Sequence, residues 1–347
     1  MNNALKNIVI TGYSSVTAAG VGADPILDLL ASGGSALSPV PEDVPGSFGQ
    51  FWGKANSFKA TDFIAPLKAR KMDRCSQLAV AASGLALKDA EIDLKSIAPE
   101  RIGIALGCGF GGVANSAEFL TGYFNGGVNG LSPMLFPNTV SNAPASNASI
   151  EHGLKGPNVT LVQRFCSAES AFMMACRFIS EGRADIMLTG GADDLMPLMM
   201  AGFAAAGQLR SYASNFGEGS GILVLESYQH AVRRGVEIKG MVERISMVGL
   251  LPKGDEQEGV GRLLADTRFC DLVSISGTTP SVPLIMQDIL DYRSFNLSSV
   301  TGRSLAMGGV SMAVLLASLK KGQNGIHLSA SPEGPYYAIR FSGGNPV

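Results

Sequence analysis

Residues 156–191 constrain the fold more than any other stretch, because a strand, a helix and a second strand follow one another there with little linker. The turn Gly156-Pro157 leads into the apolar run 158–162, which predicts a buried strand. Residues 167–179 predict an apolar helix, and residues 184–191 predict a second buried strand ending in a glycine pair. A strand–helix–strand unit of this kind predicts α/β packing with parallel-type strands.

Strands and helices alternate through most of the rest of the chain. The pattern therefore predicts layered α/β packing with mostly buried, mostly parallel-type strands. The expected strands are residues 6–11, 102–106, 217–226 and 272–276, with final strands around Ile326 and at 337–341. The expected helices are residues 24–30, 73–88, 113–124, 143–152, 282–291 and 308–320, with a further helix from Ser227, and residues 35–59 form a surface loop.

Bulk composition excludes several classes of function. The 347 residues are 46% hydrophobic, carry a formal net charge of −2 and contain no Lys/Arg run longer than a pair. This predicts a large core but neither nucleic-acid binding nor polybasic membrane attachment. No apolar run reaches membrane-spanning length, and the N-terminus lacks the pattern of a signal peptide. We therefore expect a cytoplasmic protein.

The five cysteines lie in apolar stretches without the CxxC spacing of redox or zinc motifs. They are expected to be buried, reduced thiols, which agrees with a cytoplasmic location. The cysteines are Cys75, Cys108, Cys166, Cys176 and Cys270.

Several motifs resemble those of the β-ketoacyl synthases, members of the thiolase superfamily. They are the 156–191 unit, Lys71-Met72-Asp73, the Ser-Pro…Pro segment 132–137 and the Gly-Glu-Gly-Ser-Gly run 217–221. The resemblance covers nearly the whole chain. It implies the α/β thiolase fold, with two similar halves in a five-layered αβαβα arrangement. The halves are expected at residues 1–238 and 239–347, as one integrated unit.

The resemblance also identifies a changed nucleophile position. In the family, a catalytic Cys lies nine residues after the Gly of the Gly-Pro pair and twenty before the Asp of the next strand. Phe165 stands at that spacing from Gly156 and Asp185. The family's thiolate attacks an acyl thioester from a helix N-terminus, a reaction that a phenyl ring does not perform.

Three further positions of the family's chemistry are changed. The His of a His-Gly-Thr turn corresponds to Ser276, and the His of a Thr-Gly-His turn corresponds to Arg303. The Lys five residues before that second His corresponds to Ser298. If Arg303 lies in the altered pocket, its charge needs an acid or carbonyl partner, for which alignment suggests Glu169 or Glu218.

Loss of these residues resembles the chain-length factors of type II polyketide synthases. The resemblance implies a non-catalytic, ketosynthase-like subunit, so the chain itself is expected not to be an enzyme although its complex is an acyltransferase. The implied partners are an active ketosynthase in a heterodimer, an acyl carrier protein and a polyketide or polyene acyl chain. No cofactor or metal is expected.

Two groups of residues are expected to serve that role. By resemblance, Val113, Ser116 and Leu120 form one face of a helix and line the acyl tunnel; the alternative is that they pack in the core. The strand before the active site pairs antiparallel with the partner's copy in this fold, so it is the expected interface. Its residues here are Asn158, Val159, Thr160, Leu161 and Val162.

Other functions remain open. An active acyltransferase or ketosynthase-like enzyme would use Cys166, which begins the helix after Phe165, and a homodimeric pseudoenzyme would bind acyl chains or acyl carrier protein. The three histidines, His152, His230 and His327, match no catalytic position of the family and are expected to be structural.

Two motifs resemble ligand-binding motifs but are expected not to bind those ligands. Gly107-x-Gly109-x-x-Gly112 has the form of a dinucleotide fingerprint, but no acid follows at ribose-binding distance. Asp193-Asp194 suggests a metal pair, but no His or third acid lies at ligand spacing, which favours a loop or helix-cap role.

Overall fold

The computed structural model describes most of the chain. The described residues are 7–44, 49–207, 215–250, 254–265, 270–276, 292–331 and 334–344. The helix expected at residues 282–291 lies outside them.

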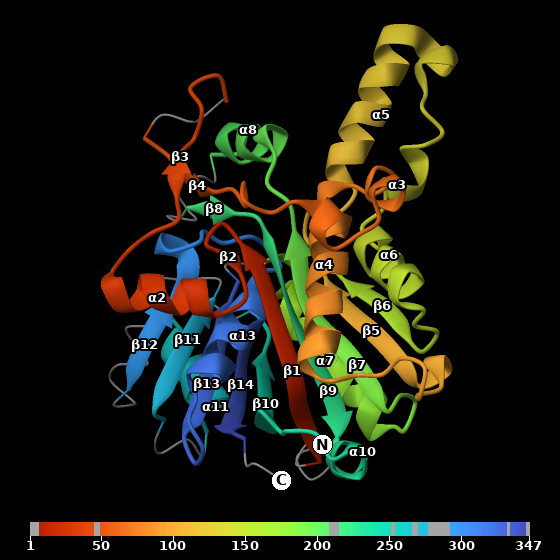
Figure 1. Ribbon diagram of the computed structural model, residues 1–347. Coiled ribbons are helices and arrows are strands. Elements are labelled where there is room, and N and C mark those ends of the chain that lie inside the picture. The colour runs from red at the N-terminus through yellow and green to blue at the C-terminus, as the bar shows by residue number, and fades with distance from the viewer. Residues whose placement is uncertain are drawn as a thin grey trace.

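The main sheet is built from two sets of five strands with the same order (Figure 1). The first set runs β6-β5-β7-β9-β1 across the sheet and the second runs β12-β11-β13-β14-β10. Numbered along the chain within each set, both orders read 3-2-4-5-1. The first set comprises β1 (Ile8–Thr17), β5 (Ile102–Gly107), β6 (Asn158–Leu161), β7 (Ile186–Asp193) and β9 (Gly219–Ser227). The second comprises β10 (Gly240–Val248), β11 (Leu272–Ser276), β12 (Arg293–Asn296), β13 (Asn324–Ala330) and β14 (Tyr336–Gly343).

The strand directions correct one expectation. Parallel pairs occur only toward the outer ends of the sheet, β7-β5-β6 and β12-β11-β13, while all pairs between β13 and β7 through the centre are antiparallel. A parallel pair needs a long crossover, whereas β13 returns into β14 through the short segment 331–335. The prediction of mostly parallel strands was therefore wrong, and the sheet is mixed. The two sets meet where β1 pairs with β10, and we propose that the halves divide near residue 239.

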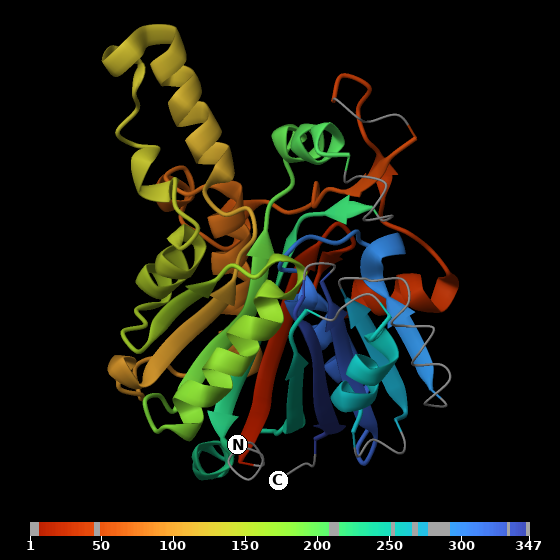
Figure 2. The same ribbon diagram turned by 180° about the vertical axis from the view of Figure 1, so that it is seen from behind.

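Helices separate and cover the two sets of strands. Two of them, α7 (Ser167–Ser180) and α13 (Gly308–Ser318), contact each other, and α13 touches strands of both sets. On the outside, α4 (Arg74–Asp89) and α6 (Ala143–His152) pack on the first set, and α11 (Glu256–Leu263) packs on β10 and β14 (Figures 1 and 2). This is the five-layered arrangement expected. Other elements include α2 (Asp24–Ser32), α3 (Pro66–Ala69), α8 (Pro197–Ala205), α10 (Tyr228–Arg234), β2 (Gly20–Val21) on β1, and a small sheet of β3 (Ser38–Pro39), β4 (Phe51–Gly53) and β8 (Phe216–Gly217).

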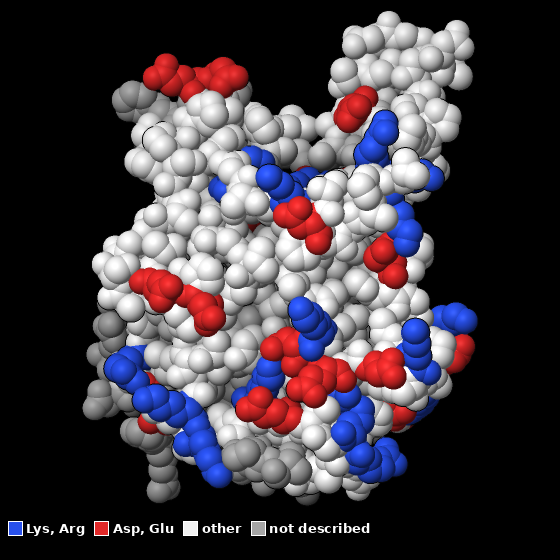
Figure 3. Space-filling model, in the orientation of Figure 1, with Lys and Arg blue, Asp and Glu red and all other residues white. Residues whose placement is uncertain are grey.

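Helix α5 (Val113–Gly126) extends away from the body of the molecule in both ribbon views (Figures 1 and 2). It has no buried residue. In Figure 3 its outer part and the following segment carry almost no charged side chains, and the sequence has no charged residue between Glu118 and Glu151. This protrusion therefore exposes neutral and apolar side chains to solvent.

Glu218, between β8 and β9, joins three separate segments of the chain. Its carboxylate accepts hydrogen bonds from Lys54 Nζ at 3.0 Å, Arg74 Nη2 at 2.9 Å and the backbone N–H groups of Ala55 and Leu195 at 3.1 and 3.2 Å. Burial alone would raise the pKa of Glu218, but the charges of Lys54 and Arg74 outweigh it and hold that pKa below its ordinary value. Glu218 is consequently a buried anion stabilised by two cations.

The variant Glu218→Gln is expected to lower the free energy of unfolding by about 2–4 kcal/mol at neutral pH, because it leaves two partly exposed cations without their counter-charge. A carboxylate with a lowered pKa stabilises the fold above its unfolded-state pKa, and this contribution disappears as pH falls through the folded-state value. The loss should therefore shrink below pH 4.5, the ordinary value for this group. Urea titrations across this range measure both effects.

Glu181→Gln is the matched control, because Glu181 forms an exposed ion pair with Arg177. Its expected cost is below about 0.5 kcal/mol at any pH. Equal costs for the two variants would contradict the role assigned to Glu218.

Candidate active-site region

Three of the four changed positions line one small cavity. Ser276 is the last residue of β11, Ser298 lies in the 3-10 helix Leu297–Ser299, and Arg303 follows the left-handed Gly302. Together with neighbours such as Asn296 and Met307 they surround a cavity of about 10 Å³. As the described residues form it, this space holds about one water molecule.

Phe165 lies beside that cavity. It is 1% exposed and packs in an apolar cluster that includes Trp52, Met200, Phe216 and Leu305. The guanidinium carbon of Arg303 lies 4.5 Å from the centre of the Phe165 ring, which is a cation–π contact. The Phe165 ring and the Arg303 guanidinium therefore lie against each other, and Arg303 lines the cavity together with Ser276 and Ser298.

The backbone before Phe165 has an unusual conformation. Arg164, in the 3-10 helix Arg164–Cys166, has φ 51°, a value that L-residues rarely adopt. This turn connects β6 to α7 and directs Phe165 into the apolar cluster. Strained turns of this kind persist only where the surrounding packing holds them.

The acids suggested as counter-charges for Arg303 are each bonded to other groups. Glu218 is held by Lys54 and Arg74, and Glu169 is held by His327 and Ser276.

Cys166, at the start of α7, is fully buried. Its Sγ lies 3.2 Å from Ser329 Oγ and donates to the carbonyl oxygen of Pro335 at 3.2 Å. Burial and the nearby charge of Glu169 raise the pKa of the Cys166 thiol well above its ordinary value. Although a helix N-terminus favours a thiolate, burial dominates here, so this sulfur is a protonated thiol.

A buried hydrogen-bonded chain crosses the region one helical turn further along α7. Glu169 Oε1 lies 2.7 Å from His327 Nε2 and accepts from Ser276 Oγ at 3.2 Å, while His327 Nδ1 lies 2.8 Å from Ser274 Oγ. Both Glu169 and His327 are completely buried. Gly308 makes room for this carboxylate, because a Cβ there would lie 2.0 Å from Glu169 Oε1.

The sequence did not predict this set of hydrogen-bonded side chains. His327 was expected only in a structural role, yet it lies on β13 in contact with an acid and with one of the changed positions, Ser276, through Glu169. The one available signal was Glu169 itself, an acid in the first turn of a largely apolar helix. The other two histidines have structural partners, since His152 bonds to the carbonyl of Val80 and His230 to Glu226.

The expected tunnel residues lie on α5, away from the small cavity. Val113 and Leu120 are exposed, and Ser116 donates to the carbonyl oxygen of Thr139 at 3.0 Å. The alternative that they pack in the core of this chain is therefore wrong.

The expected interface strand, β6, is the last strand of the sheet as described and pairs only with β5. Val162, directly after it, is 59% exposed.

The chain belongs to the β-ketoacyl synthase family. Residues 5–231 match the family described as "Beta-ketoacyl synthase, N-terminal domain". The fold and the strand–helix–strand unit around Phe165 agree with that assignment.

Curated relatives carry the names of condensing enzymes. The chain is 31% identical to 3-oxoacyl-[acyl-carrier-protein] synthase 2 of Synechocystis over 68% of this chain and 61% of that protein. It is 27% identical to the Vibrio harveyi protein of the same name over 94% of this chain and 83% of that one. The chain thus spans less than two thirds of the first of these relatives.

Solved structures share the fold at low sequence identity. One is a type II polyketide synthase ketosynthase in complex with its acyl-carrier protein (TM-score 0.83, 20% identity, covering 97% of this chain and 99% of that one). Another is the ishigamide ketosynthase/chain length factor (TM-score 0.81, 21% identity, 97% and 99%). Among the described residues, no helix is both long and apolar enough to cross a membrane.

The expectation that this chain is no enzyme is contradicted by these relatives, which are named 3-oxoacyl-[acyl-carrier-protein] synthases. That expectation equated the loss of four family residues with the loss of the enzyme class. The same region does hold other polar groups. Ser276, Glu169 and His327 are joined by hydrogen bonds, and Cys166, one helical turn away along α7, lies 3.2 Å from Ser329 Oγ.

Native Cys166 is expected to resist alkylation by iodoacetamide at mildly alkaline pH, because its thiol is buried and protonated. Peptide mass spectrometry should find the Cys166 peptide unlabelled in the folded chain and fully labelled after unfolding in guanidinium. Free glutathione in the same tube controls for reagent quality. Rapid, complete labelling of native Cys166 would contradict the thiol state derived above.

Proposed function

We propose that this chain is a subunit of a ketosynthase complex in the cytoplasm, where it pairs with a condensing ketosynthase and shapes the tunnel that holds the growing acyl chain. This is the role of a chain-length factor in polyketide or polyene synthesis. Acyl carrier protein delivers the acyl chain to the complex. The single observation that carries the proposal is the exposed surface of the outer part of α5 and the segment after it, which has no charged residue between Glu118 and Glu151.

That surface has the composition of a protein interface. Apolar side chains project from it over a stretch without charged residues, and depletion of charge with enrichment of aromatic residues marks the centre of protein interfaces. Phe124 is 79% exposed and is one of several exposed apolar side chains in this stretch, and contiguous exposed apolar patches mark interaction sites. The large exposed side chains of this surface are Leu120, Tyr123, Phe124, Val128, Met134 and Phe136.

The β6 edge of the sheet also favours pairing with a ketosynthase partner. Ile104 N–H and Cys108 N–H bond to the carbonyl oxygens of Pro157 and Leu161, so alternation leaves the backbone groups of Asn158 and Thr160 directed away from β5. An unpaired edge of this kind is a template for another strand. A partner that pairs along β6 would also cover Val162 and lie near α5.

The acyl chain would reach this subunit along α5 rather than through the small cavity. A cavity of about 10 Å³ beside Ser276 and Arg303 has no space for an acyl thioester. Val113, Ser116 and Leu120, by contrast, lie on a helix without buried residues, where a partner's tunnel could continue.

A second candidate is condensation by this chain itself, favoured by the names of its curated relatives. The two functions differ in which subunit carries the acyl group. Intact masses of both subunits after incubation with acyl-[acyl-carrier-protein] separate them: an adduct on the partner alone supports the first candidate, and an adduct on this chain supports the second.

Co-expression with a ketosynthase from the same genome is expected to give a stable heterodimer, and Val162→Asp should weaken it at least about 100-fold. The reason is that burying an unpaired carboxylate in an interface costs several kcal/mol. Size-exclusion chromatography with light scattering and a titration of the two subunits measure the effect.

The matched control is Val232→Asp, the same change at a valine on α10 that is 39% exposed and outside the proposed interface. It should bind as the unchanged chain does. A monodisperse monomer that binds none of the tested ketosynthases would overturn the proposal.

The variant Ser116→Phe is expected to give shorter products at near-normal initiation rates with the heterodimer intact, because the added ring narrows the tunnel wall. Product masses from the reconstituted complex measure chain length. Glu118→Phe adds the same ring about 200° around the helix and should leave the products unchanged. Identical products from Ser116→Phe and the unchanged chain would remove α5 from the tunnel.

A further inference from the structure

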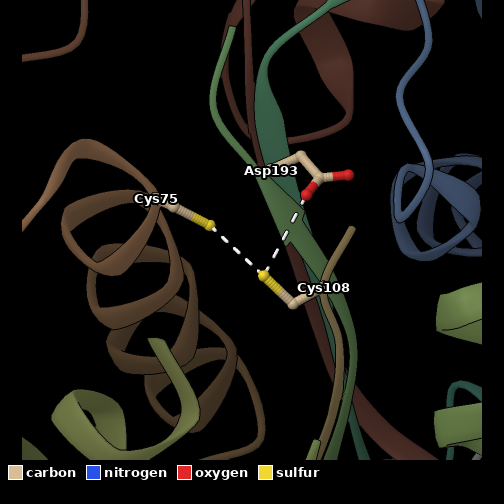
Figure 4. A group of neighbouring side chains, drawn as sticks. All are labelled: Cys75, Cys108 and Asp193. Atoms are coloured by element: carbon tan, nitrogen blue, oxygen red, sulfur yellow. Dashed lines mark hydrogen bonds between the residues drawn. The ribbon is translucent and has the colours of Figure 1, made fainter. Parts of the chain in front are cut away.

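Two cysteines and an aspartate from three separate elements meet in the core near the root of α5. Cys75 lies in the first turn of α4, Cys108 follows β5, and Asp193 ends β7. Figure 4 shows the three side chains pointing toward one another, and one ligand atom from each lies within 4.8 Å of the other two. All three residues are completely buried.

The spacing of the sulfur atoms fits a shared metal ion. Cys75 Sγ and Cys108 Sγ are 3.7 Å apart, and Cys108 Sγ is 4.0 Å from Asp193 Oδ1. With zinc–sulfur bonds of about 2.3 Å, two sulfurs of a tetrahedral site lie roughly 3.7 Å from each other. The three atoms thus surround a point that a thiophilic cation would occupy with small movements.

The backbone around the sulfur of Cys108 resembles the second layer of a metal site. Gly111 N–H donates to Cys108 Sγ at 3.2 Å, and the N–H groups of Gly109 and Phe110 donate to Asp193 Oδ1 at 2.8 Å each. Such donors orient and stabilise anionic ligands. A Cβ at Gly111 would lie 2.3 Å from the sulfur, so the loop closes around Cys108 only with glycine there.

A further buried acid adds negative charge to this region. Asp194 is 4% exposed, and its Oδ1 has no hydrogen-bond partner among the residues that the structure describes. Its negative charge acts on the Cys75 thiol. A divalent cation between the two cysteines and Asp193 would offset part of this buried negative charge.

We propose that Cys75, Cys108 and Asp193 bind a thiophilic divalent cation, zinc above all. Binding replaces the two thiol protons, which leave to solvent, by two metal–sulfur bonds and involves no change of oxidation state. Because all three ligand residues are completely buried, the ion would be structural. It would fasten α4, the loop 107–112 and the end of β7 to one another.

Sequence reasoning dismissed Asp193-Asp194 as a metal pair, since no third ligand lies at ligand spacing along the chain. The missing ligands come from α4 and from the end of β5, far away in sequence. Neither cysteine belongs to a CxxC motif, so only the fold brings them to the aspartates.

The test is the metal content of the full-length chain, produced in zinc-supplemented medium and dialysed without chelator. Elemental analysis should find about one zinc ion per chain. A colorimetric chelator should detect this zinc only after unfolding, because the site is buried. Cys75→Ser and Cys108→Ser should each lose most of the metal, whereas Cys176→Ser, at a buried cysteine outside the cluster, should keep it.

A second measurement keeps the proposal testable where a serine variant does not fold. Native mass spectrometry of the unchanged chain should show the mass of the polypeptide plus zinc minus two protons. A metal-free native mass after reconstitution with zinc would overturn the proposal. So would a mass lower by two hydrogens that reducing agent restores, since this would make the pair a disulfide.

Discussion

The close approach of α13 to the first half of the sheet is the contact on which the rest of the site region depends. A Cβ at Gly221 would lie 2.1 Å from the nitrogen of Val310, and a Cβ at Gly309 would lie 2.2 Å from the carbonyl oxygen of Gly221. Backbone therefore packs on backbone between β9 and α13. Because the turn with Arg303 leads directly into this helix, the packing also positions Arg303, and Gly308 leaves the space that Glu169 fills. The glycine-rich start of α13 thus sets the positions of both Arg303 and Glu169.

Much of the fold was predictable from sequence, for reasons that are local. The expected helices at 143–152, 167–179 and 308–320 correspond to α6, α7 and α13 to within two residues at either end, because long apolar periodic segments leave little ambiguity. Strand direction was less accessible, since it depends on which elements become neighbours. For α5 the sequence left two possibilities, a face toward a partner or packing in the core. Its pattern of apolar residues is that of any amphipathic helix, and only the missing charges between Glu118 and Glu151 distinguish it.

The site region divides in the same way. The resemblance to the family's motifs identified Phe165, Ser276, Ser298 and Arg303, and the structure places all four in one neighbourhood. The contact of Glu169 with His327 spans 158 positions of sequence, and that of Cys75 with Cys108 joins a helix to the end of a strand. Such contacts follow from topology, which no local pattern encodes. Residues that replace a family's reactive groups can be identified from the sequence. Side chains that only the fold brings next to them can be identified only from a structure.

The root of α5 has a mechanical consequence. This 14-residue helix is attached to the body through Gly112, at φ 78°, and through the loop that Asp193 holds by two N–H groups. At 1.5 Å per residue it is about 21 Å long, so a rotation of about 10° at its base displaces the far end by roughly 4 Å. The Asp193 carboxylate, at the end of β7, thus holds the base about which this helix would rotate. Replacing Asp193 removes these two hydrogen bonds and is therefore expected to shift the far end of the helix, where Phe124 is 79% exposed.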